Sequence, residues 1–197
     1  AGGDFSGMSQ SERSELFSQY FNTGIHGICF SSYVEGQEPG DIIGTAQIEA
    51  RVKILKPYTN WVRTFSCTDG NELIPGIAKA HGLKTMVGAW LSDDLELNER
   101  EIENLVKVVK DGQADLVAVG NEVLYRKELT EKELLAYIHK VKELVPEAEV
   151  GYVDAYYEFK NRPAITEACD VIYANCYPFW EGCHINYSLP YMKTMYQ

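Results

Sequence analysis

Six short apolar runs alternate along the chain with stretches in which apolar residues recur at helical spacing. Most of these runs are continuously apolar, as is typical of parallel strands that are covered on both faces. The repeated order of strand and helix predicts a parallel α/β sheet. The predicted strands lie in HGICFSSY from His26, NWVRTFS from Asn60, KTMVGAWL from Lys84, DLVAVGNEV from Asp115, EVGYVDAYY from Glu149 and DVIYANCYPFW from Asp170.

The segments between the runs carry helix signals. Thr130 and Glu133 form a capping box, and Gly82 is a natural left-handed residue to end a helix over 71–81. Glu101 is one of several acidic residues that suit the positive start of a helix. Helices are predicted over 46–56, 71–81, 98–110 and 163–168, after Thr130, and from Ser188 onward.

Length and charge bound the domain organisation and the partners. A chain of 197 residues with 45% hydrophobic residues is expected to form one ordered domain over 26–197, preceded by a polar N-terminal extension over 1–25. The net charge of −11 and the lack of a basic patch argue against nucleic acid and anionic membranes. No membrane span and no signal peptide are found, so we expect a soluble protein of unassigned compartment.

The cysteines and histidines give no sign of a metal site. The five cysteines are an odd number spread over strand-like segments, which argues against a disulfide framework. The four histidines are scattered in the same way. We therefore expect neither a metal nor another cofactor.

Reactive or aromatic polar side chains close nearly every predicted strand. A barrel gathers all its strand ends around one pocket, whereas an open doubly wound sheet spreads them along an edge. A dinucleotide-binding open sheet would also show a glycine-rich turn after its first strand, where this chain has SSYVEGQEPGD. We therefore predict a (β/α)8 TIM barrel with about six units present, whose strand-end residues are Tyr33, Arg63, Trp90, Glu122, Asp154 and Tyr177.

The run DLVAVGNEV ends in an amide beside a carboxylate, Asn121 and Glu122. One interpretation is a turn followed by a solvated acid. The other is a catalytic acid held at the rim of the barrel. The aromatic residues near the strand ends have two interpretations as well, because they could stack on the apolar faces of sugars or simply pack in the core.

The segments GICFSSYVEGQEPG, NWVRTFSCTDG, VAVGNEV and NCYPFW occur in this order. They resemble the bacterial branch of family 17 glycoside hydrolases, which are β-1,3-glucanases and related transglycosylases on a (β/α)8 barrel. The resemblance covers about residues 25 to 182. VGNEV is its most specific motif, because Asn-Glu closes the fourth strand throughout the clan of barrel glycosidases.

The resemblance implies a role for several residues. Glu122 would be the general acid/base, Asn121 would hydrogen-bond the sugar 2-hydroxyl, and Arg63 would support the carboxylates. Tyr177 would line the cleavage subsite. Independently of the resemblance, the place of Trp180 near a strand end favours a ring that stacks on sugar. Tyr33, Trp90 and Asp154 are expected to contact the β-glucan oligosaccharide or polysaccharide.

The family retains anomeric configuration, and its nucleophile is a second glutamate at the end of a seventh strand. No position of this chain matches that glutamate, so we expect that about two more units complete the barrel. Asp154 and Glu181 are nearby alternatives but are expected to be subsite or solvated carboxylates.

Several functions remain open. The first is retaining hydrolysis of β-1,3-glucan, and the second is β-1,3-glucan transglycosylation through the same intermediate. A non-catalytic glucan-binding barrel is a third. A lyase or aldolase has no support, because no lysine closes a predicted strand.

Overall fold

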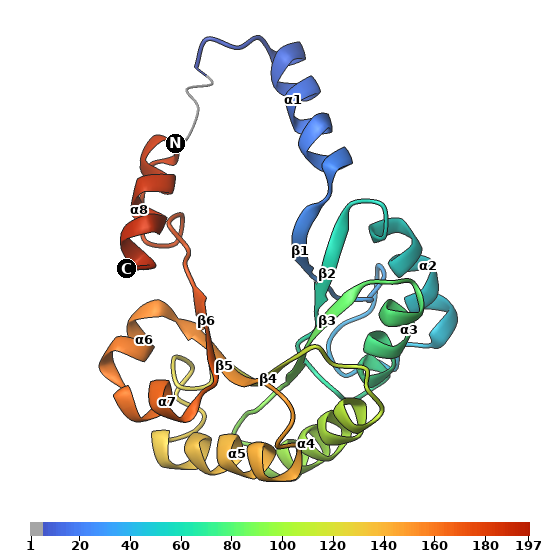
Figure 1. The fold of residues 1–197 in the computed structure, drawn as a ribbon, viewed down its shortest axis with the longest axis vertical. Coiled ribbons are helices and arrows are strands. Elements are labelled where there is room, and N and C mark those ends of the chain that lie inside the picture. Colours follow the sequence, from blue (N-terminus) through green and yellow to red (C-terminus); the bar gives the residue numbers. More distant parts are fainter. Residues whose placement is uncertain (1–5) are drawn as a thin grey trace.

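The computed structural model describes residues 6–197, and six strands among them form one parallel sheet. Each strand pairs with the next along the chain. The strands are β1 (Ile25–Cys29), β2 (Thr59–Arg63), β3 (Lys84–Ala89), β4 (Leu116–Asn121), β5 (Val150–Ala155) and β6 (Val171–Asn175). Figure 1 shows that the sheet is curved like part of a barrel wall. The predicted class, a (β/α)8 barrel with about six units present, is confirmed.

Helices fill the connections and lie on the convex side of the sheet, where α2 to α7 follow its curve (Figure 1). Parallel neighbours require such crossovers, because the chain must return to the same end of the sheet. None of the helices within residues 6–197 is long and apolar enough to cross a bilayer. The helices are α1 (Gln10–Thr23), α2 (Thr45–Leu55), α3 (Ile74–Ala80), α4 (Leu95–Lys110), α5 (Glu131–Leu144), α6 (Tyr156–Asn161), α7 (Pro163–Ala168) and α8 (Ser188–Met195), with short 3₁₀ turns η1 (Asn71–Leu73) and η2 (Ile185–Tyr187).

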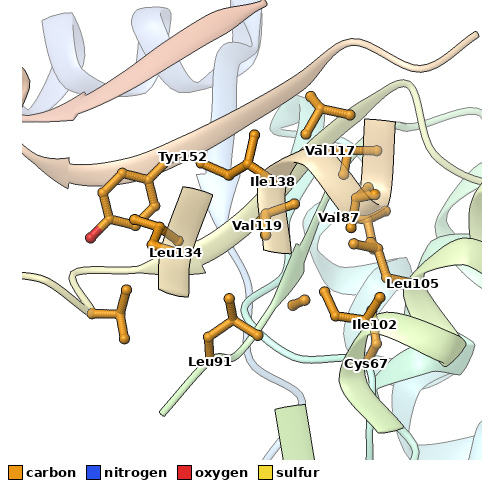
Figure 2. Close-up of a cluster of buried hydrophobic side chains, with 14 of the residues drawn as sticks. Cys67, Val87, Leu91, Ile102, Leu105, Val117, Val119, Leu134, Ile138 and Tyr152 are labelled. Atoms are coloured by element: carbon orange, nitrogen blue, oxygen red, sulfur yellow. The ribbon is translucent and has the colours of Figure 1, made fainter. Parts of the chain in front are cut away.

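The larger hydrophobic core lies between the sheet and helices α4 and α5 (Figure 2). Alternate residues of a strand point to the same face, so the helix-facing set is apolar. Burying one such aliphatic side chain contributes roughly 1.5–3 kcal/mol. The buried residues that meet there include Val87, Val117, Val119, Ile102, Leu105, Leu134 and Ile138. This packing fixes the strands whose ends carry the predicted site.

Some element boundaries differ from the prediction. Helix α4 begins at Leu95, where the Asp94 side chain accepts from Leu97 N and caps it. Glu101 is consequently in the second turn and buried, not at the helix start. Strand β5 ends at Ala155, and the tyrosines that follow it begin α6. The capping box of Thr130 starts α5 as predicted.

The sequence does not predict helix α1. Ser9 and Glu12 form a capping box at its start, yet the helix buries none of its residues. Its described ring contact with the barrel joins Phe21 and Tyr58, whose centroids are 5.6 Å apart. Residues 1–5 of the predicted extension lie outside the described residues, and the predicted division at residue 25 stays a prediction.

Candidate active site

The carboxyl ends of the strands lie at one end of the curved sheet, and predicted site residues follow them. Arg63 is the last residue of β2, while Trp90 and Glu122 come directly after β3 and β4. Tyr33 and Tyr177 lie in the loops after β1 and β6. Because all the strands are parallel, these residues share the end of the barrel at which such folds place their active sites.

A bulge in β4 sets the direction of Asn121. Ala118 pairs with Gly151 and Asn121 with Val153, so three steps along β4 match two along β5. Gly120 supplies the bulge with a φ of +89°, which residues with a side chain rarely adopt. In an unbroken strand Asn121 would face the helices. The extra residue turns it to the inner face of the barrel.

Arg63 crosses the inner face from β2 to β4. Its Nη2 donates to Asn121 Oδ1 at 2.5 Å. The guanidinium also lies 4.6 Å from the centre of the Phe65 ring. Because Oδ1 accepts from Arg63, the amide of Asn121 is oriented and its Nδ2 can donate to a ligand.

Glu122 is held in an uncommon backbone conformation. Its φ is +53°, in the left-handed region that costs a residue with a side chain roughly 1–2 kcal/mol. Glu122 N donates to Val153 O at 2.7 Å, and Asn175 Nδ2 donates to Glu122 Oε1 at 2.6 Å. Strain that surrounding contacts maintain in this way clusters at functional sites.

Arg126 stabilises the end of β4 at Asn121. Its guanidinium donates to Asn121 O and, at 2.8 Å, to Leu91 O. The group also pairs with Glu128 at 2.6 Å and lies 4.4 Å from the centre of the Trp90 ring. Arg126 therefore ties the end of β4 to the end of β3.

Glu122 lines a cavity of about 620 Å³. Trp180 is 80% exposed and Tyr177 46% exposed, so their rings are available to a ligand. Burial raises the pKa of Tyr177 above its ordinary value, and the nearby Glu122 carboxylate raises it further. As for any tyrosine at neutral pH, the hydroxyl is protonated and can donate. Glu181 is a second carboxylate in the lining and accepts from Tyr191 Oη at 2.7 Å. The lining consists of Glu122, Tyr125, Ala155, Tyr157, Asn175, Tyr177, Trp180 and Glu181.

Tyr33 and Trp90 lie in the wall of a different cavity, of about 440 Å³, beside the loops that follow β1 to β3. Tyr33 Oη accepts from Asn71 Nδ2 at 3.3 Å. Trp90 stacks under Arg126, which itself contacts the residue before Glu122. The structure therefore separates the predicted aromatic residues into two groups. Trp90 lies next to Arg126, which contacts the strand end that carries Glu122.

Asp154 lies beneath the surface and lines neither of these cavities. It is fully buried, and its carboxylate accepts from Tyr152 Oη, from Ala155 N at 2.7 Å and from Tyr125 N at 3.4 Å. Burial raises the pKa of this carboxyl group. Leu124 N donates to Tyr152 Oη at 3.0 Å, so Tyr152 and Asp154 together hold the loop that follows Glu122. Contact between Asp154 and a sugar stays a prediction.

Sequence reasoning missed two residues that build the site. Asn175 ends β6 and donates to Glu122, and its signal was its position as a second asparagine that closes a largely apolar strand. Glu101 organises the loops after β2 and β3 through four hydrogen bonds. Its signal was a carboxylate on the apolar stripe of α4, next to Ile102 and Leu105.

The site offers a carboxylic acid, oriented amides and exposed aromatic faces. Within residues 6–197, no group of three or more His, Cys, Asp or Glu side chains is placed to hold a metal ion. A curved (β/α) barrel whose fourth strand ends in Asn-Glu defines a barrel of the glycosidase class. More narrowly, the chain belongs to the family of the BtgE/BtgC glycoside hydrolase domain, whose profile matches residues 27–197.

Curated relatives include glucan 1,3-beta-glucosidases of Candida albicans and Saccharomyces cerevisiae, which are 27% and 28% identical over 162 and 160 residues. Each alignment covers 73% of this chain, but 52% and 51% of the relatives. The chain thus spans about half the length of these curated relatives. The family model and these relatives confirm the resemblance at the level of the family. Because both relatives are fungal, assignment to the bacterial branch stays a prediction.

The fold is similar to a solved family 17 beta-1,3-glucanosyltransferase from Rhizomucor miehei. The TM-score is 0.75 at 29% identity, over 91% of this chain and 65% of that one. An active-site mutant of the same enzyme has been solved in complex with laminaritriose. The match supports a partial family 17 barrel.

Proposed function

We propose that the protein containing these residues hydrolyses β-1,3-glucosidic bonds of glucans with retention of anomeric configuration, and that Glu122 is its general acid/base. One observation carries the proposal. The Glu122 side chain, at the end of β4, is held by Asn175 in the wall of a cavity that aromatic rings line. The printed activities of the relatives support β-1,3-glucan as the substrate class.

In this mechanism Glu122 first donates its proton to the glycosidic oxygen as the bond to the anomeric carbon breaks. The carboxylate so formed then takes a proton from the water that releases the product. Retention requires a second carboxylate as nucleophile, roughly 5–5.5 Å from the first. The family resemblance assigns it to a glutamate closing a seventh strand, and none of β1 to β6 supplies it.

The neighbouring side chains have supporting roles in the proposal. The Nδ2 group of Asn121, oriented by Arg63, donates to the 2-hydroxyl of the reacting sugar. The protonated hydroxyl of Tyr177 donates within the cleavage subsite. The exposed ring of Trp180 stacks on a neighbouring sugar. These groups position the substrate while Glu122 moves the proton.

Transglycosylation is the second candidate. The same glycosyl-enzyme is then attacked by a sugar hydroxyl instead of water, and Glu122 takes the proton from that hydroxyl. The exposed Trp180 beside the cavity would bind such an acceptor. The similarity to a glucanosyltransferase also favours this reaction.

The test compares Glu122→Gln with the unaltered full-length protein on laminarin. Gln keeps the shape of Glu but cannot donate the required proton, so turnover should fall about 10²- to 10⁴-fold while binding persists. Glu147→Gln, at an exposed position in the turn before β5, is the matched control and should be fully active.

Chromatography of the products distinguishes shortened chains from lengthened ones, and therefore hydrolysis from transfer. Unchanged turnover in Glu122→Gln would exclude Glu122 as the acid. Glucan binding by the unaltered protein without any turnover would instead favour the non-catalytic barrel.

A further inference from the structure

The cavity that contains Tyr33 and Trp90 has the composition of a sugar-binding subsite. Its volume is about 440 Å³, and Phe65 adds a third aromatic ring to its wall. Asp69 and Asn71 also line it. Ligand pockets typically combine apolar and aromatic walls with a few well-placed polar groups, and this cavity has both.

Asp69 is displayed on a rigid loop. Its φ is +57°, and its carbonyl oxygen accepts from Ile43 N at 2.9 Å. The next residue, Gly70, has a φ of +92°, and a Cβ there would lie 2.1 Å from Ile43 O. Asp tolerates the left-handed region better than most residues, but such a conformation persists only where its surroundings impose it. These backbone contacts fix the direction in which the Asp69 side chain leaves the loop, and Thr68 Oγ1 donates to its Oδ2 at 3.5 Å.

The walls of the cavity are preorganised by one buried side chain. Glu101 Oε1 accepts from Ser66 Oγ at 2.5 Å and from Thr68 Oγ1 at 2.7 Å. Its Oε2 accepts from Cys67 N at 2.7 Å and from Trp90 N at 3.0 Å. The loop before Asp69 and the backbone of Trp90 are thus fixed to the same carboxylate.

The cavity is also connected to the proposed catalytic centre. The Trp90 ring, in its wall, lies 4.4 Å from the Arg126 guanidinium. Arg126 donates to the carbonyl of Asn121, which precedes Glu122. The two cavities share no lining residue, so a glucan chain that extends from Glu122 to the carboxylate of Asp69 has to pass the Trp90 side chain.

We propose that this cavity is a distal subsite for β-1,3-glucan, in which the Asp69 carboxylate accepts hydrogen bonds from the hydroxyls of a glucosyl unit remote from the bond that is cleaved. The inference rests on the proposed function and adds a determinant of chain length to it. Because the contact lies away from the reacting carbon, it favours only substrates long enough to reach it.

The test is Asp69→Asn in the full-length protein, assayed on laminari-oligosaccharides of increasing length. Asn tolerates a positive φ, so the loop is kept while the charge and one acceptor oxygen are lost. We expect kcat/KM to fall about 10- to 100-fold for the longest oligosaccharides, the range of a hydrogen bond to a charged group. The shortest oligosaccharide that is cleaved should be unaffected. Asp111→Asn, at an exposed position after α4, is the matched control and should change neither value.

An equal loss at every length, or no loss at any, would overturn the distal subsite while leaving the proposed function intact. Calorimetric titration separates the two claims further. In the Glu122→Gln background, Asp69→Asn should weaken binding of laminarihexaose but not of laminaribiose. That difference would support the subsite even if the unaltered protein proved unable to cleave glucan, and identical hexaose affinities would exclude it.

Discussion

The buried carboxylate of Glu101 allows a quantitative prediction, because one substitution keeps an acceptor for the neighbouring N–H groups and another removes it. The side chain is 1% exposed and accepts four hydrogen bonds. Two donors are the backbone N–H groups of Cys67 and Trp90, which have no alternative orientation. The other two are the hydroxyls of Ser66 and Thr68, which can rotate and accept instead.

Glu101→Gln should therefore be tolerated. Its carbonyl oxygen can face the two N–H groups while its amide donates to the two hydroxyls, so we expect unfolding free energy within about 1 kcal/mol of the unaltered value at pH 7. Glu101→Leu leaves both backbone N–H groups buried and unpaired. At about 1–3 kcal/mol each, the expected loss is about 2–6 kcal/mol, a large fraction of a typical domain's stability.

Urea unfolding of the full-length protein at pH 7 measures both values. Glu103→Leu, on an exposed position of the same helix, controls for helix propensity and should change stability by less than about 0.5 kcal/mol. A Glu101→Leu protein as stable as Glu101→Gln would show that the substitution does not leave the two backbone N–H groups unpaired.

The difference in unfolding free energy between the unaltered protein and Glu101→Gln should depend on pH. Burial raises the pKa of folded Glu101 above its ordinary value of 4.5. The stability contributed by the protonated group is therefore complete below that ordinary value and is lost as pH rises through the folded-state pKa. Relative to Glu101→Gln, the unaltered protein should lose unfolding free energy across that rise. A difference that does not vary with pH would contradict the assigned shift.

Two further substitutions test the strand end and the aromatic rim. Gly120→Ala places a Cβ at a φ of +89° and 3.3 Å from the Tyr152 ring, so it should cost about 1–2 kcal/mol and lower turnover by moving the bulge. Gly112→Ala, at a φ of +70° with no atom within 4 Å, should show a similar thermal destabilisation with full activity. Trp180→Ala should weaken oligosaccharide binding in calorimetry and leave stability within about 0.5 kcal/mol, because the ring is exposed; unchanged affinity would exclude stacking.

The architecture could be predicted from the sequence because it depends on repeated local signals. Continuous apolar runs and helix caps such as Thr130 recur along the chain. Their repeated order of strand and helix indicates a parallel sheet even where a single segment is ambiguous. Helix α1 escaped the prediction because its capping box, Ser9 and Glu12, precedes a segment that buries nothing. Periodicity detects helices through their buried faces, so an exposed helix gives little signal.

The direction of the site residues could not be predicted in the same way. Whether Asn121 faces the helices or the interior depends on the bulge at Gly120, which exists only in the pairing with β5. The residues Glu101 and Asp154 are buried by tertiary contacts that no short segment encodes. Asn175 ends β6 and meets Glu122, which follows β4, across 53 residues of sequence and past the intervening strand β5.

The most direct test of Glu122 as the acid/base uses Glu122→Ala in the full-length protein with a dinitrophenyl β-laminaribioside. Dinitrophenolate leaves without a proton, so the glycosyl-enzyme should still form, whereas its hydrolysis lacks the base that activates water. Azide needs no such base. We expect added azide to restore turnover and to yield the β-glycosyl azide, with retained configuration. An absence of rescue, or formation of the α-glycosyl azide by direct displacement, would contradict the assignment of Glu122.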